Sequence, residues 1–372
     1  MRIAHIAPLY ESVPPRLYGG TERIVAYLAD ALVDLGHDVT VFASGDSSTR
    51  AELVSARALA FRLDPHPLKS DLAAHLSMLH EVRRRADEFD LLHFHVDLLH
   101  FPLFEDIAER TVTTLHGRLD LEDLAGIYQR WPRFPLVSIS DRQRLPLRFA
   151  HWVGTAYHGL PPELLEPPAT PSGGYVAFLG RISPEKRPDR AISIARRAGR
   201  PLRMAAKVDA VDVGYYREEI EPLMTGGGVE FIGEINDAGK RLFLGNADAL
   251  LFPIDWPEPF GLVMIEAMAC GTPVIAWDCG SVREVIDHGV TGFIVDSEEQ
   301  AVEAVARLPE LDRGEIRRVF ERRFSAPVMA RRYLELYESV LTSSAMGADM
   351  SPTRSLSPTL PAQPATALVY SA

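Results

Sequence analysis

The sequence has little cysteine: only Cys270 and Cys279 occur in 372 residues. Two cysteines cannot form the disulfide framework of a small secreted domain, and this usage is typical of a reducing compartment. No apolar run approaches the roughly 18 residues that a membrane-spanning helix needs. The apolar run at the N-terminus, Ile3–Ala7, is too short for a signal peptide. We therefore expect a cytoplasmic protein.

Positive charge is also scarce, since the net charge is −12. A general nucleic-acid-binding protein needs a basic surface, so the charge balance argues against that class. Any anionic substrate must instead be held by a local group of cations. Two basic clusters, Arg83–Arg85 and Arg317–Arg323, are interpreted as solvated helix faces, with peripheral membrane contact as the alternative.

Several catalytic and nucleotide-binding motifs are missing. The dinucleotide fingerprint G-x-G-x-x-G, a P-loop, G-x-S-x-G and H-E-x-x-H do not occur. Their absence argues against a dinucleotide-dependent oxidoreductase, a P-loop NTPase, an α/β-hydrolase and a zinc protease of the common types. There is no D-x-D pair either, so the sequence offers no paired aspartates to clamp a metal-bound diphosphate.

What is present is an alternation of short apolar runs with amphipathic stretches. Strands alternating with helices predict βαβ units and a parallel sheet. Between the first two predicted strands, apolar residues recur at helical spacing from Ile24 to Leu35, and Gly36 follows as a stop. Two series of strands are predicted, at 3–7, 39–43, 91–95, 111–115 and 136–139, and then at 175–179, 202–206, 229–232, 249–252, 274–276 and 293–295.

A segment rich in proline and glycine separates the two series and predicts two doubly wound α/β domains. A helix with an apolar face follows the second, and the chain then becomes rich in Ser, Thr, Pro and Ala, a composition that predicts disorder. The predicted organisation is a first domain at 1–160, a linker at 161–174, a second domain at 175–324, a helix at 325–342 and a disordered tail at 343–372.

The most informative stretch runs from Asp255 to Glu266. Glu258 lies in a Pro- and Gly-rich turn directly after a predicted strand, and Glu266 lies about one turn into a predicted helix that begins at Leu262. The N-terminus of this helix offers free N–H groups and positive partial charge, which favour a phosphate. Glu258 can then reach one polar part of a ligand and Glu266 another, such as a sugar diol.

In each predicted domain, the loop that follows the first strand also carries candidate ligand-binding residues. Gly19 and Gly20 open a helix, and glycine lets backbone approach a phosphate closely. Arg181 and Lys186 are five residues apart in one loop, so both can converge on one anion. Alternatively, the glycines form a simple entry to a helix and the charged loop is only solvated.

Histidines end several predicted strands. His116 follows the strand at 111–115. His93 and His95 lie on one face of a strand, so zinc is conceivable, but no carboxylate or cysteine spacing completes a ligand set and no metal site is predicted. His158 is predicted to be structural, at the hinge between the domains.

Together these segments resemble the family 4 retaining glycosyltransferases of GT-B architecture. The resemblance covers about residues 1–341 and rests on Glu258–Glu266 with the segment Pro259–Ala276, on Gly19-Gly20-Thr21-Glu22, on Gly180–Lys186 and on His116. It implies two facing Rossmann-like domains with a C-terminal helix crossing back to the first. It further implies transfer of a sugar from a nucleotide-diphosphate sugar, here a UDP-sugar, with retention of configuration and without a metal or other cofactor.

The resemblance also implies roles for individual residues. The donor diphosphate would lie against Gly19, Gly20, Arg181, Lys186 and the helix start Phe260-Gly261-Leu262. Glu258 and His116 would face the reacting sugar, and Glu266 the ribose. The acceptor, a saccharide, lipid or small molecule, would contact loops of the first domain. A nucleotide-sugar epimerase, a phosphorylase and a non-catalytic nucleotide-sugar-binding protein remain alternatives.

Overall fold

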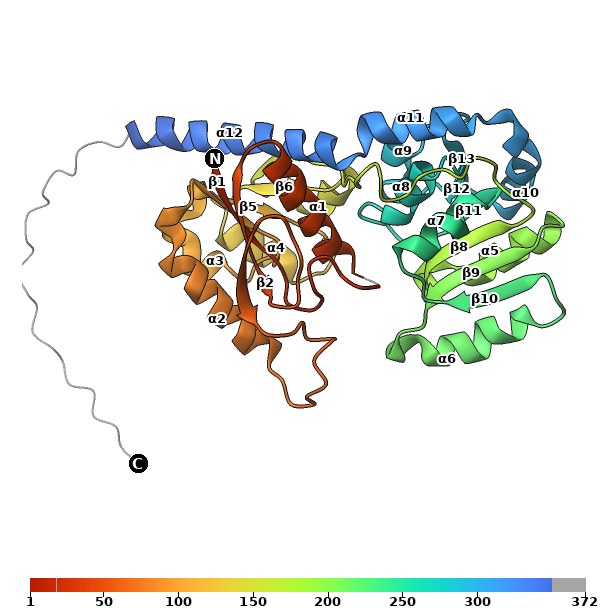
Figure 1. Ribbon diagram of the computed structural model, residues 1–372, viewed down its shortest axis with the longest axis horizontal. Coiled ribbons are helices and arrows are strands. Elements are labelled where there is room, and N and C mark those ends of the chain that lie inside the picture. Colours follow the sequence, from red (N-terminus) through yellow and green to blue (C-terminus); the bar gives the residue numbers. More distant parts are fainter. Residues whose placement is uncertain (18, 350–372) are drawn as a thin grey trace, which may run out of the picture.

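The computed structural model describes residues 1–17 and 19–349. Two α/β domains lie side by side, and one long C-terminal helix leads back from the second domain and runs along the first (Figure 1). Each domain is built on its own parallel sheet, so the predicted fold class is confirmed.

The first sheet has seven strands in the order β3-β2-β1-β4-β5-β6-β7. All neighbours pair in parallel. Successive residues of β1 are buried on opposite faces, with Ile3 in one core cluster and Ala4 in another, as the period of two requires. The strands are β1 (Arg2–Ile6), β2 (Asp38–Ser44), β3 (Glu52–Arg57), β4 (Leu91–Phe94), β5 (Thr111–Thr114), β6 (Leu136–Ser138) and β7 (Trp152–Thr155).

The second sheet has six parallel strands in the order β10-β9-β8-β11-β12-β13. In both sheets the order reverses beside the first strand, between β1 and β4 and between β8 and β11, and such a switch point is where ligands bind in open α/β sheets. The strands are β8 (Val176–Arg181), β9 (Leu202–Lys207), β10 (Val229–Gly233), β11 (Ala249–Phe252), β12 (Val274–Trp277) and β13 (Gly292–Val295).

Two helices that matter for the site begin and end at glycines. Helix α1 starts at Gly20 and is followed by Gly36, whose φ of +85° ends it. Helix α8 starts after Gly261 (φ +80°) and is closed by Gly271 (φ +67°). The helices are α1 (Gly20–Asp34), α2 (Asp71–Arg84), α3 (Phe101–Phe104), α4 (Leu124–Arg130), α5 (Pro188–Arg197), α6 (Val213–Tyr215), α7 (Asp237–Gly245), α8 (Leu262–Ala269), α9 (Val282–Val285), α10 (Glu298–Arg307), α11 (Arg313–Arg323) and α12 (Ala326–Asp349).

The crossing helix is α12, drawn in blue along the top of Figure 1. It leaves the second domain, packs on α1 and buries two tyrosines completely. The hydroxyl of Tyr337 lies 2.7 Å from His93 Nδ1, and that of Tyr333 lies 2.9 Å from Thr114 Oγ1. These buried hydrogen bonds join the last helix to the sheet of the first domain.

The end of this helix differs from the prediction, which ended the helix at 342 and began a disordered tail at Ser343. Helix α12 continues to Asp349. The residues that follow Ser343 include alanine and methionine, which are good helix formers, and the first proline comes only at Pro352. The remainder of the predicted tail, 350–372, lies outside the described residues.

Two strands were not predicted, β3 and β7. Each is at an edge of the first sheet, and their residues are mostly half-buried or exposed. An edge strand lacks the continuous apolar run that reveals a buried parallel strand. Within the ranges the structure describes, no helix is both long and apolar enough to cross a membrane.

Candidate functional site

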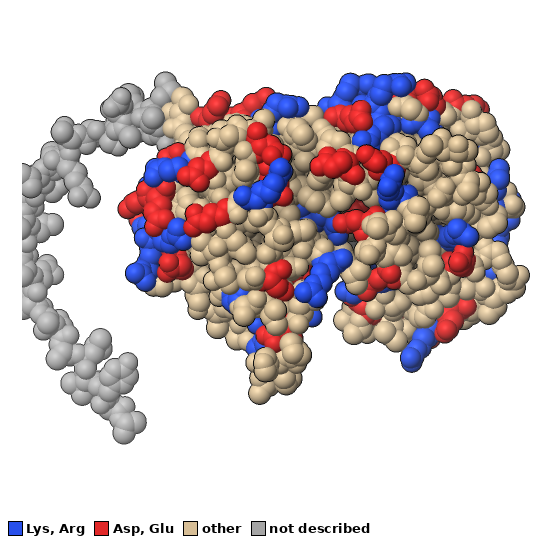
Figure 2. Space-filling view, in the orientation of Figure 1, with Lys and Arg blue, Asp and Glu red and all other residues tan. Residues whose placement is uncertain are grey.

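A cavity of about 260 Å³ lies between the two domains, at the carboxyl ends of both sheets. In the space-filling view the surface is notched where the two lobes meet (Figure 2). All the residues predicted from the sequence to form a site line this one cavity, namely Gly19, Gly20, His116, Arg181, Lys186, Glu258, Phe260, Gly261, Leu262 and Glu266.

Glu258 is held in place by its loop and by two side chains. Trp256 Nε1 donates to Glu258 Oε2 at 3.0 Å, and Lys186 forms an ion pair with the same oxygen. Behind the loop, Gly280 adopts φ +56°, and a Cβ there would lie 2.4 Å from both N and O of Glu258. A glycine at this position therefore allows the close approach that sets the direction of the Glu258 carboxylate.

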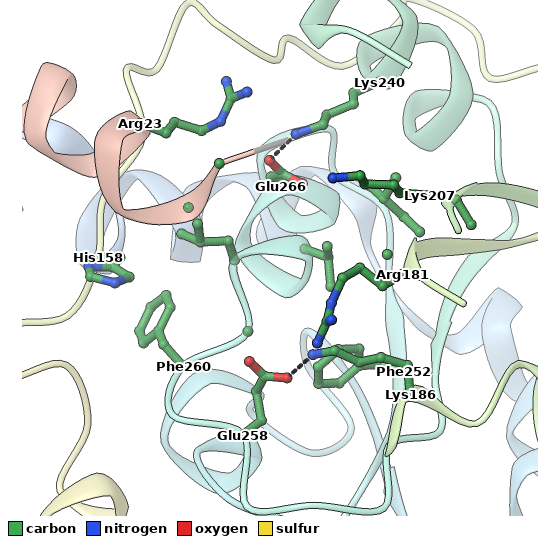
Figure 3. A pocket seen from close by; sticks show the side chains of 18 of the residues that line it. Arg23, His158, Arg181, Lys186, Lys207, Lys240, Phe252, Glu258, Phe260 and Glu266 are labelled. Carbon is green, nitrogen blue, oxygen red and sulfur yellow. Dashed lines mark hydrogen bonds and ion pairs between the residues drawn. The ribbon is translucent and has the colours of Figure 1, made fainter. Parts of the chain in front are cut away.

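Arg181 and Lys186 come from the end of β8 and the turn that follows it. Both point into the cavity beside Glu258 (Figure 3). Arg181 also forms ion pairs with Glu185 at 2.9 Å and Asp209 at 3.5 Å. The Lys186 ammonium lies 4.9 Å from the ring centre of Trp256. The two cations predicted to converge on one anion are thus on the same side of the cavity, each balanced by a carboxylate.

Three further cations line the cavity that the sequence did not reveal: Arg23, Lys207 and Lys240. Lys240 Nζ lies 2.6 Å from Glu266 Oε1, and Arg23 Nη1 lies 2.6 Å from Asp237 Oδ2 across the domain boundary. Arg23 belongs to α1, Lys207 to β9 and Lys240 to α7. No short motif links them, so only the folded arrangement brings them together.

The loops that enclose the cavity approach each other across the domain boundary. A Cβ on Gly20 would lie 3.5 Å from Leu262 Cδ1, at the N-terminus of α8. At Gly19 a Cβ would lie 2.8 Å from Pro15 Cβ, so no larger residue has room there. The start of α8, with its free N–H groups, therefore faces Gly19 and Gly20, which carry no side chains.

Hydrogen bonds near the Glu258 loop also connect the two domains. Ser140 Oγ donates to the carbonyl of Pro259 at 2.6 Å. The Glu284 carboxylate accepts from the N–H groups of Asp141 (2.7 Å) and Arg142 (2.9 Å). Glu284 thus links the second domain to the first next to the Glu258 loop.

His116 enters the cavity from the end of β5. Its Nε2 lies 2.9 Å from His95 Nδ1, and His95 Nε2 lies 3.1 Å from His5 Nδ1. Burial lowers the pKa of His116 to about 3 and that of His5 to about 3. These rings are therefore neutral hydrogen-bonding groups at neutral pH.

The nitrogens of His5, His93 and His95 lie within 4.8 Å of one another, which raises the question of a metal. Both nitrogens of His93 already have hydroxyl partners at 2.7 Å, Thr114 and Tyr337. A metal would have to displace one of them and would place a charge in the core, and the group found among the described residues contains no carboxylate to balance it. The cluster is accounted for as a hydrogen-bond network.

His158, predicted to be structural at the hinge, also lines the cavity. Its ring stacks on His116 at 5.3 Å and meets the edge of Phe260 at 4.9 Å. The next residue, Gly159, lies against the chain at Ser325, where a Cβ would approach its carbonyl oxygen to 2.5 Å. His158 thus contributes to the wall of the cavity as well as to the hinge.

Comparison with known proteins defines the class. Two family models match in succession, "Glycosyltransferase Family 4" over residues 18–156 and "Glycosyl transferases group 1" over residues 167–323. AviGT4, a glycosyltransferase involved in avilamycin A biosynthesis, has a TM-score of 0.68 and 24% identity, covering 92% of this chain and 98% of that one. The fold is GT-B, and the protein is a glycosyltransferase.

More particularly, the chain belongs to the family 4 glycosyltransferases. Phosphatidyl-myo-inositol mannosyltransferase of Mycobacterium leprae is 29% identical over 92% of this chain and 98% of its own length. Anabaena Alr3699/HepE, solved in complex with UDP and glucose, has a TM-score of 0.71 and 19% identity, covering 91% of this chain and all of that one.

Proposed function

We propose that the protein transfers a sugar from a nucleotide-diphosphate sugar, in the first place a UDP-sugar, to an acceptor hydroxyl with retention of anomeric configuration. The observation that carries the proposal is the cleft itself. The Glu258–Lys186 ion pair, Arg181, the start of α8 and the Gly19–Gly20 loop all face one cavity between two domains. Cations and a helix N-terminus suit a diphosphate, and a carboxylate beside them suits a sugar.

In this proposal the diphosphate lies against Arg181, Lys186 and the N–H groups that begin α8. Negative charge grows on the leaving diphosphate as the bond to the sugar breaks. Fixed donors and cations aimed at that charge stabilise the transition state more than the ground state. Arg181 and Lys186 would thereby supply the stabilisation directly, and no metal or other cofactor is part of the proposal.

Glu258 would hold hydroxyl groups of the transferred sugar and stabilise its positive, oxocarbenium-like state. Glu266 would accept hydrogen bonds from the ribose diol while Lys240 holds its other side. The leaving phosphate would help to deprotonate the acceptor on the same face of the sugar, which gives retention. His116 would contact the donor sugar, next to His158.

The names of relatives narrow the first substrates to test. A phosphatidyl-myo-inositol mannosyltransferase is among them, so an inositol-bearing lipid is our first acceptor and a nucleotide-linked mannose one of the donors. UDP-glucose is another, because a GT-B neighbour was solved with UDP and glucose. A non-catalytic sugar-binding protein and an epimerase would not transfer sugar to any acceptor.

The test begins with a thermal-shift screen of UDP- and GDP-linked hexoses, because a bound donor raises the melting temperature by mass action. Donors that bind are then incubated with acceptors, and the product is examined by proton NMR. We expect a glycoside with the anomeric configuration of the donor. A product of opposite configuration would refute retention, and a bound donor that is neither hydrolysed nor transferred would refute catalysis.

A further inference from the structure

Three histidines form a hydrogen-bonded chain that runs from the core of the first domain to the cavity. His5 belongs to β1, His95 follows β4, and His116 follows β5, so the chain crosses three adjacent strands. The two links are His5 Nδ1 to His95 Nε2 at 3.1 Å and His95 Nδ1 to His116 Nε2 at 2.9 Å. Only His116 lines the cavity.

The number of protons in this chain is fixed. Burial lowers the pKa of His5 and His116 to about 3 and that of His95 well below its ordinary value, so all three rings are neutral at neutral pH. A neutral imidazole carries one N–H and one lone pair. Two of the three N–H groups form the two links, and the third must therefore lie at one end of the chain.

The two ends differ. At the inner end, His5 has no exposed surface and its Nε2 has no partner among the described residues. At the outer end, His116 Nδ1 is also buried and without a partner there, but His116 lines the cavity, where a bound ligand can supply one. A buried N–H without an acceptor is rarer in proteins than a buried acceptor without a donor. The N–H therefore belongs at the outer end.

We propose that His5 and His95 are positioning residues that fix His116 in the tautomer with its proton on Nδ1, so that His116 presents a neutral hydrogen-bond donor to an oxygen atom of the ligand. This inference deepens the proposed function and rests on it for the ligand, a nucleotide sugar. His116 then contacts the sugar as a donor and not as a base. The opposite tautomer would turn a lone pair toward the ligand, so that His116 could only accept a hydrogen bond from a hydroxyl and could not donate one.

The direct test needs no substrate. Nitrogen-15 NMR of the histidine-labelled protein at pH 7 distinguishes a protonated ring nitrogen from a bare one, and the spectrum of His116→Phe assigns the His116 signals. We expect the proton on Nδ1 in the wild type. In His95→Phe, which removes the partner of His116 Nε2, the signals should show both tautomers. A wild-type His116 protonated on Nε2 would overturn the proposal, as would an unchanged tautomer in His95→Phe.

A second measurement follows the same chain through function. His5→Phe leaves His95 and His116 in place but removes the inner link, so turnover of the donor should fall about fivefold, the effect of one neutral hydrogen bond. The matched control is His100→Phe, which replaces another buried histidine of the first domain that is outside the chain. This variant should keep its turnover per folded molecule.

The two measurements separate the two hypotheses. If no nucleotide sugar is turned over by the wild type, the proposed function fails, while the nitrogen-15 spectrum still decides the tautomer of His116. If turnover is normal in His5→Phe and the tautomer of His116 is unchanged in His95→Phe, the positioning role is refuted and the proposed function stands.

Discussion

Replacing Glu258 by glutamine should tighten the binding of UDP while it slows sugar transfer. Lys186 is paired with Glu258, and the two side chains are only 15% and 12% exposed. A diphosphate must take Lys186 from this carboxylate and must also lie beside its negative charge. Glu258→Gln removes both obstacles and keeps the shape of the side chain.

The magnitudes follow from the kind of interaction. A charge-assisted hydrogen bond contributes about 1.5–3 kcal/mol, so Lys186→Met should weaken UDP binding by about 10- to 150-fold. An exposed ion pair would account for only about 0–1 kcal/mol. Relief of the competition in Glu258→Gln should strengthen binding by about 1 kcal/mol, or about fivefold, a fraction of the roughly 4 kcal/mol that two charges 4 Å apart exert at an effective dielectric constant of 20.

Isothermal titration calorimetry with UDP measures both changes, beside donor turnover for each variant. The matched control is Arg187→Gln, which removes the positive charge next to Lys186 in the sequence. Arg187 pairs with Asp189 and Asp255, neither of which lines the cavity. Its affinity for UDP should equal that of the wild type. Weaker binding by Glu258→Gln would show that this carboxylate does not compete with the ligand for Lys186, and unchanged binding by Lys186→Met would remove Lys186 from the diphosphate site.

Three other outcomes are expected. Donor turnover should persist in excess EDTA, and activity that is lost and then restored by magnesium or manganese would contradict a metal-independent mechanism. Glu266→Ala should raise the KM for the donor more than it lowers kcat, whereas Glu258→Ala should lower kcat by on the order of a hundredfold. Equal effects of the two variants on kcat would contradict the assigned roles. Acid should destabilise the fold. Burial lowers the pKa of His5 from 6.5 to about 3, so below about pH 6.5 the unfolded chain binds a proton that the folded chain does not. The free energy of unfolding therefore falls as the pH drops below about 6.5. Urea unfolding at pH 7 and pH 5 should show a loss of about 2 kcal/mol for this residue, smaller in His5→Phe, and no such difference between wild type and variant would refute burial as the cause.

Much of the second domain could be predicted from its sequence because most of its strands are largely buried, the edge strand β10 being the exception. Most of its six strands, such as Ala249–Phe252, are short apolar runs, and the prediction located all six. The loops that end such strands carry recognisable residues, so Arg181, Lys186, Glu258 and Glu266 could be identified and indeed meet in one cavity. Their chemical roles stay predictions.

What could not be predicted depends on long-range contacts. The edge strands β3 and β7 owe their conformation to one neighbouring strand each, and their sequences carry no continuous apolar run. Lys240 and Arg23 belong to elements far apart in the chain, and only the facing of two domains gives them a place in the cavity. The histidine chain is similar: His93 and His95 were visible as a pair, but His5 lies 90 residues from His95.

The crossing helix has a consequence for how the chain matures during synthesis. Tyr337 closes a hydrogen bond to His93 that lies 244 residues earlier, and Tyr333 closes one to Thr114 that lies 219 residues earlier. At about 5–20 residues per second, a ribosome needs about 10–50 s to make the intervening chain. Throughout that interval the nascent first domain lacks the helix that covers one side of α1, while the core cluster that contains only second-domain residues, from Val176 to Val305, can form as soon as it emerges. The domain that is made first is therefore the last to be finished.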